Sequence, residues 1–336
     1  MPLSHRKQKL IIVGTGDYYR TILGPSLEIL KKQGFIEVLA TVSISENEGM
    51  ANTQHLIRCP AEQLSHLLSD FRNLNPIVIL GHTNELHTAD AQDLVRHGFR
   101  VLVEKPYCTD NAQLATMRTL LRRYPNKIGL MEYYLMMKTI PLLVVAGKIR
   151  EASFYNTRRS ILQYAPSFQF ATLQDTIQDI IGTPRQIYID LLEGEGATGR
   201  LEHRGSALTD TRKGGGMIQD LGTHALVALF ALQDCIGTID PSFRNGIVRP
   251  ARCKEYIRAM KKIFSLPEER IAESYAELEF CTSTNIPVFA AVGKYLPQNS
   301  NQRRILILGS EGRLYLDLSS CALYGARGEN QEIPLL

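Results

Sequence analysis

The chain has no tryptophan, no long hydrophobic run and little net charge. Its 38 basic and 34 acidic residues are scattered and give a net charge of +4, with no Lys/Arg block to follow a phosphate backbone. The longest purely apolar helical stretch, residues 225–232, is far short of a membrane span, and the start runs into a strand instead of a signal peptide. We therefore expect a cytoplasmic protein that binds neither nucleic acid nor membrane.

Cysteine is scarce and widely spaced. The six cysteines are Cys59, Cys108, Cys235, Cys253, Cys281 and Cys321. They include no Cys-x-x-Cys pair, and no histidine stands at a metal-ligand spacing, which favours reduced core thiols and predicts no metal site. With 336 residues, 44% of them hydrophobic, the chain is long enough for two cores. We predict two domains, residues 1–131 and 132–336.

Short apolar strands alternate with helical segments in the first domain. The expected strands are residues 10–13, 36–43, 77–80, 100–103 and 127–131. This alternation is typical of βαβ units, which build an open parallel sheet with ligands at its carboxyl edge. The sequence therefore predicts an α/β fold that begins with a Rossmann sheet.

The first strand breaks at a Gly-x-Gly loop. Glycines at positions one and three of such a turn let the backbone approach a pyrophosphate, and the next helix supplies amide donors. The third glycine of that fingerprint is replaced by Tyr19, which would crowd the contact between helix and strand. We therefore expect either a displaced loop or a helix that starts later, near Thr21. The candidate cofactor-binding residues of the loop are Gly14, Thr15, Gly16, Asp17 and Tyr18.

The end of the second strand bears on the choice between NAD and NADP. An NAD site usually places Asp or Glu there to accept from the ribose hydroxyls, but this chain has Ser43. Without a carboxylate at this position, the 2′-phosphate of NADP would not be repelled. No arginine follows that could bind this phosphate, however. Glu46 and Glu48, just beyond, are alternative ribose ligands. The pattern favours NADP slightly and leaves NAD open.

The loop after strand 77–80 would meet the glycine loop at the same sheet edge. Thr83 and Asn84 can donate to the phosphates or the nicotinamide half of a cofactor, and Asn84 is about equally suited to cap a helix. His87, near the start of the expected helix 88–97, is a further candidate for cofactor binding, although surface histidines are common there.

The stretch that organises the chain is Glu104-Lys105-Pro106. It follows strand 100–103, and a strand of an open α/β sheet places its successor at the ligand-binding edge. Pro106 fixes φ, so the backbone leaves the sheet in a set direction and Lys105 is aimed at a site. An exposed Glu-Lys-Pro turn is the alternative interpretation.

The second domain has a different pattern. Apolar residues at helical spacing over 142–181 predict helices beside the sheet. The segments that follow alternate polar and apolar residues, which is typical of a mostly antiparallel sheet covered on one face. The expected strands are residues 186–192, 275–281, 288–292, 304–308 and 313–318.

Two polar residues interrupt the most apolar helix of this domain. Residues 194–216 form a polar, glycine-rich stretch of the kind that makes lids or binding loops, and it leads into Asp220 and His224. Their spacing of four puts both side chains on one helix face. An imidazole beside a carboxylate suits proton transfer near neutral pH. A pair that caps its own first turn is the structural alternative.

Together, Glu104-Lys-Pro106, the Gly-x-Gly loop and Gly-Gly-Gly-x-x-x-Asp220-x-x-x-His224 resemble the Gfo/Idh/MocA oxidoreductases. The resemblance spans roughly residues 9–324. It implies a Rossmann domain that binds NAD or NADP and a C-terminal α/β domain whose open antiparallel sheet holds a sugar, cyclitol or related polyol. It further implies that Lys105 hydrogen-bonds the reacting oxygen, that His224 exchanges the hydroxyl proton, and that Asp220 binds the substrate or steers His224.

Some features depart from the family pattern. Tyr19 replaces a small residue, Ser43 replaces an acid, and residues 142–181 look like an insertion. Residues 132–138 and 193–200 are faintly similar to glucose-6-phosphate dehydrogenase, a relative with the same two-domain plan. That similarity implies a phosphorylated or anionic sugar, held by Tyr133, Lys138 and Arg200.

We therefore predict an NAD(P)-dependent dehydrogenase or reductase acting on CH-OH groups of a sugar, cyclitol or sugar phosphate. Glu104 joins Lys105 among the residues expected near the cofactor. Two alternatives remain: a glycoside hydrolase that oxidises a sugar carbon transiently and keeps its nicotinamide, and a non-catalytic binding protein. An exposed sheet face in the second domain favours a dimer or tetramer.

Overall fold

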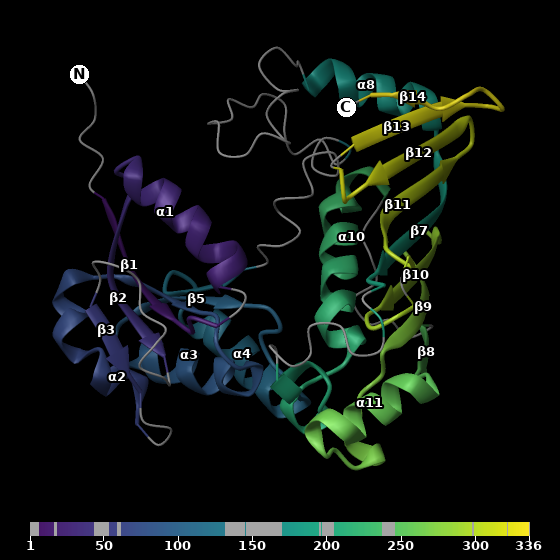
Figure 1. Cartoon of the computed structure of the whole chain (residues 1–336). Helices are drawn as coiled ribbons and strands as arrows, with labels where there is room; N and C mark the ends of the chain where they lie inside the picture. Colours follow the sequence, from purple (N-terminus) through teal and green to yellow (C-terminus); the bar gives the residue numbers. More distant parts are fainter. Residues whose placement is uncertain are drawn as a thin grey trace, which may run out of the picture. The chain divides into compact units, whose positions relative to one another are not determined.

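Figure 1 shows a computed structural model of the chain, which divides into two compact units. One consists of residues 1–131 with 212–214, and the other of residues 132–211 with 215–336. The structure describes residues 7–16, 19–43, 54–58, 62–131, 145, 170–194, 196, 205–236, 246–297, 299–320 and 322–335. The predicted site residues outside these ranges are Asp17, Tyr18, Glu46, Glu48, Tyr133, Lys138 and Arg200.

The first unit contains a six-stranded parallel sheet in the order β3-β2-β1-β4-β5-β6. Its strands are β1 (Gln8–Val13), β2 (Ile36–Ser43), β3 (Gln54–Ile57), β4 (Ile77–Leu80), β5 (Arg100–Glu104) and β6 (Ile128–Met131). Its helices are α1 (Gly24–Lys32), α2 (Leu64–Leu67), α3 (His87–Arg96) and α4 (Asn111–Arg123). The strand order reverses between β1 and β4, which is the switch point where open α/β sheets bind ligands. The predicted Rossmann sheet is confirmed.

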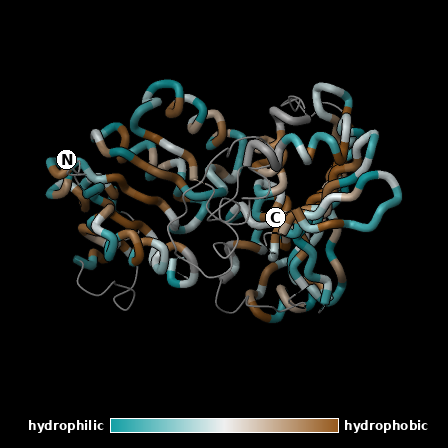
Figure 2. Tube along the Cα trace, turned by 90° about the horizontal axis from the view of Figure 1, so that it is seen from above, coloured by the Kyte–Doolittle hydropathy of each residue, from teal (hydrophilic) through white to brown (hydrophobic). Residues whose placement is uncertain are grey.

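Two apolar layers enclose this sheet. One joins α2, α3 and α4 to the sheet through residues such as Leu64, Leu94 and Met117, and the other joins α1 to its opposite side. Figure 2 shows the hydrophobic segments running along the strands of each unit. Asp110 caps α4, since its carboxylate accepts from the Gln113 amide at 2.8 Å.

The second unit contains an eight-stranded sheet in the order β14-β13-β12-β11-β7-β10-β9-β8. Its strands are β7 (Pro184–Leu192), β8 (Ile247–Ala251), β9 (Tyr275–Cys281), β10 (Pro287–Gly293), β11 (Gln302–Gly309), β12 (Gly312–Asp317), β13 (Ala322–Arg327) and β14 (Ile333–Pro334). Its helices are α8 (Phe170–Ile181), α10 (Thr223–Ile236) and α11 (Lys254–Phe264). The sheet is mostly antiparallel, as predicted, but β7 and β10 run parallel.

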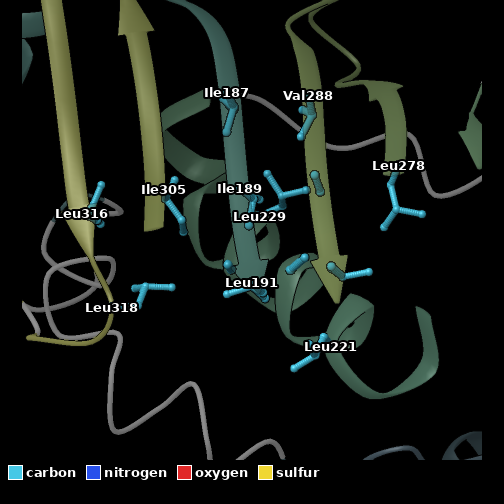
Figure 3. Packing of buried hydrophobic residues seen from close by; sticks show 14 of the residues in the cluster. Ile187, Ile189, Leu191, Leu221, Leu229, Leu278, Val288, Ile305, Leu316 and Leu318 are labelled. Atoms are coloured by element: carbon cyan, nitrogen blue, oxygen red, sulfur yellow. The ribbon is translucent and has the colours of Figure 1, made fainter. Parts of the chain in front are cut away.

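One face of this sheet packs against α10. Alternate residues of β7, Ile187, Ile189 and Leu191, point inward with Val288 of β10 and contact the core cluster that includes Leu229 (Figure 3). Residues Thr211–Leu232 are long and apolar enough to resemble a membrane span, but 56% of the most apolar 18-residue window within them is buried in the protein. Burial against a sheet accounts for the apolar sequence of α10, as in the core helix of a globular protein.

Candidate active site

The glycine loop lies at the carboxyl end of β1. Gly14 has φ of +96°, and a Cβ there would lie 2.6 Å from the backbone nitrogen of His82, so only glycine fits. A Cβ on Gly16 would have no neighbour within 4 Å. The backbone is therefore accessible at Gly16, which fits the close approach of a pyrophosphate. Thr15, between them, is buried.

Tyr19 is the first residue of the helix that follows the glycine loop. The chain starts its helix at Tyr19 as a π-helical turn (Tyr19–Leu23) and becomes an α-helix at Gly24, so the expected start near Thr21 is wrong. The Tyr19 ring is buried in the layer under α1, and a Cβ on Gly24 would lie 3.2 Å from the ring. The wider turn and the glycine provide the space that the tyrosine needs. Burial, with a smaller effect of Glu28, raises the pKa of Tyr19 to about 12.

Ser43 is buried at the end of β2, where NAD sites commonly carry a carboxylate. Its hydroxyl lies 3.2 Å from Nε2 of His55, and the hydroxyl of Thr41 lies 3.0 Å from Nδ1 of the same ring. His55 belongs to β3, a strand whose sequence is too short and too polar to predict a strand. The group at this position is thus a hydroxyl paired with an imidazole.

Of the three residues predicted in the loop after β4, only His87 has a side-chain hydrogen bond within the part of the chain that the structure describes. Thr83 is exposed and makes no side-chain cap hydrogen bond to the 3-10 turn that begins at Asn84. His87 is buried, and its Nδ1 lies 2.9 Å from the carbonyl oxygen of Pro106. His87 therefore contacts the Glu-Lys-Pro turn through a hydrogen bond.

The Glu-Lys-Pro turn begins at the last residue of β5. Glu104 is buried, whereas Lys105 is partly exposed and Pro106 follows through a cis peptide bond. Register places Glu104 beside Met131, the last residue of β6. The predicted position of Lys105, directly after a strand of the parallel sheet, is confirmed, and that position is the ligand-binding edge of such sheets.

The second unit brings Asp220 and His224 to the start of its central helix. Asp220 lies in a π-helical turn (Ile218–Gly222) and His224 in the first turn of α10, and both are buried. The glycine run before them is required by packing, because Gly216 has φ of +131° and a Cβ there would lie 2.4 Å from a Glu273 carboxylate oxygen. That carboxylate accepts from the amide of Ile218 at 2.9 Å and holds the start of the turn.

A buried ion-pair cluster surrounds Asp220, and no short sequence motif indicates it. Lys294, at the end of β10, donates to the carboxylate of Asp220 and lies 3.4 Å from that of Glu193. Arg303 donates to the other Glu193 oxygen at 2.8 Å. Burial alone would raise the pKa of Glu193, but the charges of Lys294 and Arg303 outweigh it and hold that pKa below its ordinary value.

The positions of Glu193 and Lys294 in the sequence, each directly after a strand, could have located this cluster. Glu193 and Lys294 directly follow β7 and β10, which are the parallel pair of the second sheet. Because parallel neighbours end at the same edge, their next residues lie together. The prediction of a mostly antiparallel sheet did not say which two strands run parallel, so it did not bring Glu193 and Lys294 together.

The known oxidoreductase family with an NAD-binding Rossmann fold, Gfo/Idh/MocA, matches residues 8–131. No curated protein matches the chain in sequence. Three similar solved structures cover 98% of this chain. An oxidoreductase from Thermotoga maritima has TM-score 0.68 and 17% identity, with 83% of its own chain covered. The WlbA dehydrogenase from Bordetella pertussis, in complex with NADH and UDP-GlcNAcA, has TM-score 0.66 and 13% identity, with 80% covered. An aldose-aldose oxidoreductase from Caulobacter crescentus, complexed with glycerol, has TM-score 0.64 and 16% identity, with 83% covered.

These structural likenesses show a shared fold at low identity, and the family match is confined to the first unit. Its residues include the Gly-x-Gly loop and the Glu-Lys-Pro turn, two of the three features on which the predicted resemblance depends. That resemblance is confirmed: residues 8–131 carry the NAD-binding Rossmann fold of the Gfo/Idh/MocA oxidoreductase family.

Proposed function

We propose that this protein is an NAD(P)-dependent oxidoreductase that transfers a hydride between a nicotinamide cofactor and a hydroxyl or carbonyl carbon of a sugar, cyclitol or sugar phosphate. The observation that carries the proposal is Lys105, placed directly after β5 at the ligand-binding edge of a family-matched Rossmann unit. The nicotinamide, when bound, supplies the hydride chemistry.

The glycine loop fits the pyrophosphate of that cofactor. Gly14 makes the tight turn, and the open space beside Gly16 admits a phosphate. We infer a slight preference for NADP, because the hydroxyl of Ser43 would not repel a 2′-phosphate as a carboxylate would.

Lys105 and His224 are proposed to act on the same reacting carbon. The ammonium of Lys105 would donate to the reacting oxygen, and the imidazole of His224 would take or give the hydroxyl proton. Asp220 would bind the substrate or orient His224, with its charge balanced by Lys294. Tyr133, Lys138 and Arg200 remain proposed substrate ligands. The similar WlbA structure, in complex with NADH and UDP-GlcNAcA, supports a sugar-like substrate. A cytoplasmic location stays a proposal from the sequence alone.

A substrate panel tests the activity. Sugars, cyclitols and their phosphates are incubated with NAD+ and with NADP+, and absorbance of the reduced nicotinamide is followed. Steady production with at least one substrate is expected. Release of an aglycone without net redox would indicate the glycoside hydrolase instead. The absence of a saturable fluorescence change on titration with NADH and NADPH would favour the non-catalytic binding protein.

The outer face of the second sheet is proposed to pair two copies of the chain. One register row crosses five neighbouring strands and carries half-buried large side chains: Phe289, Tyr188, Leu306, Tyr315 and Tyr324. The adjacent row places Arg304 between Asp190 and Asp317, so it carries both signs of charge. An apolar row beside mixed charges suits a self-complementary two-fold interface.

Sedimentation measures this association. The parent protein is expected to sediment as a dimer or larger, and Tyr188→Glu as a monomer, because a carboxylate in the middle of the apolar row would be buried without a partner. Leu74→Glu, at an exposed position of the first unit, should leave the mass unchanged. A monomeric parent protein at micromolar concentration would rule the interface out.

A further inference from the structure

The turn that carries Lys105 is held by the first two residues of α3. Nδ1 of His87 donates to the carbonyl of Pro106 at 2.9 Å, and the hydroxyl of Thr88 donates to the carbonyl of Tyr107 at 3.0 Å. Both α3 residues are buried. Two consecutive carbonyls beyond Lys105 are therefore fixed to one rigid helix, which limits the directions in which the lysine can leave the strand.

The ring of His87 is itself braced. It stacks on the ring of His82, with centroids 5.2 Å apart and an interplanar angle of 30°. Nε2 of His82 lies 2.6 Å from the Asp90 carboxylate, which also accepts two hydrogen bonds from Arg58 at 2.5 and 2.8 Å. Asp90 is thus satisfied by a bidentate arginine, and His82 is held against His87 by a fixed partner.

The His87 ring is a neutral donor. Burial, with a smaller contribution from His82, lowers the pKa of His87 to about 4, against the opposing effects of the Pro106 and His82 carbonyls. A carbonyl only accepts, so the proton of the neutral ring sits on Nδ1. The ring therefore holds the turn without placing a second positive charge next to Lys105.

We propose that His87 is a positioning residue for Lys105, acting through the Pro106 carbonyl. The proposal rests on the proposed function, in which Lys105 contacts the reacting oxygen. It replaces the cofactor-binding role that the sequence suggested for His87. A catalytic group misplaced by about 1 Å can cost on the order of 100-fold in rate. Loss of this hydrogen bond should therefore lower turnover more than it lowers the stability of the protein.

Two substitutions at one position separate the hydrogen bond from packing. His87→Leu removes the donor and keeps an apolar side chain of similar bulk, whereas His87→Asn keeps an N–H near the place of Nδ1. Val95→Ala is the matched control, because Val95 is a fully buried core residue of the same helix and lies far along it from the turn.

The experiment measures turnover, nicotinamide affinity and amide hydrogen exchange over residues 105–109. His87→Leu is expected to lower kcat by about 10- to 100-fold, to leave the fluorescence-derived Kd for reduced nicotinamide within about threefold, and to speed exchange in the turn about tenfold. His87→Asn should recover most of the turnover and the exchange protection. Val95→Ala should destabilise the protein without either local effect.

The outcomes distinguish this proposal from the proposed function. Normal exchange in the turn of His87→Leu overturns the positioning role, whatever the activity. Parental kcat in the same variant also overturns it. If the parent protein turns over no substrate of the panel, the proposed function fails, and the exchange measurement alone decides whether His87 holds the turn.

Discussion

Lys105→Met is expected to lower turnover by on the order of 1,000-fold, because it removes the ammonium that donates to the reacting oxygen. The side chain is partly exposed at the end of β5, so its loss should change the free energy of unfolding by less than about 0.5 kcal/mol. Steady-state kinetics on the active substrate and urea unfolding measure the two effects separately.

Lys127→Met provides the control for charge. Lys127 is an exposed lysine at the other end of the same sheet, directly before β6, so its replacement changes the net charge equally while leaving the Glu-Lys-Pro turn intact. Its turnover should equal that of the parent protein. A matching fall in both lysine variants would mean that long-range electrostatics, and not Lys105, sets the rate.

A double-variant cycle with His224→Asn tests whether the amine and the imidazole serve one reaction step. When two groups act in one step, their losses of turnover are strongly non-additive, because removing the first group already abolishes most of what the second contributes. The double variant is therefore expected to be about as slow as the slower single variant. Losses that multiply would assign Lys105 and His224 to independent steps.

Strand-level patterns predicted the fold because they depend on local periodicity. Strands 36–43, 77–80 and 275–281 have the predicted bounds, since each is a compact β-rich run with clear stops. Short strands with polar or exposed residues, such as β3 and β8, were missed because their stability comes from neighbours in the sheet and not from their own pattern.

The sequence predicted the position of Lys105 at the end of a strand, but it did not predict the contacts that support the site. Lys105 follows directly from sheet topology. The hydrogen bond from His87 to Pro106 joins positions that are 19 residues apart, and Lys294 reaches Asp220 across 74 residues. Such pairings depend on tertiary register, which a single sequence does not encode in any short motif. Tyr19 shows the same limit, because the π-helical turn and Gly24 that accommodate it act together.

Lys294→Met is expected to destabilise the second unit by about 3–5 kcal/mol, because it removes the cation that donates to the buried carboxylate of Asp220. Glu193 would lose one of its two cationic neighbours and keep Arg303. Urea unfolding at pH 7 measures the loss. Lys261→Met is the matched control: its ion pair with Glu268 is exposed to solvent, so breaking it should have little effect.

The pH dependence of this loss identifies its cause. In the parent protein the lowered pKa of Glu193 contributes stability above its unfolded pKa, and this contribution disappears as the pH falls through the folded pKa. Without Lys294, the raising effect of burial on the pKa of Glu193 is opposed mainly by Arg303, so this carboxyl group takes up a proton at a higher pH than in the parent protein. The difference between parent and Lys294→Met should therefore shrink from pH 7 to pH 5. A difference that stays constant over this range would assign the loss to packing of the lysine stem instead of to the buried charges.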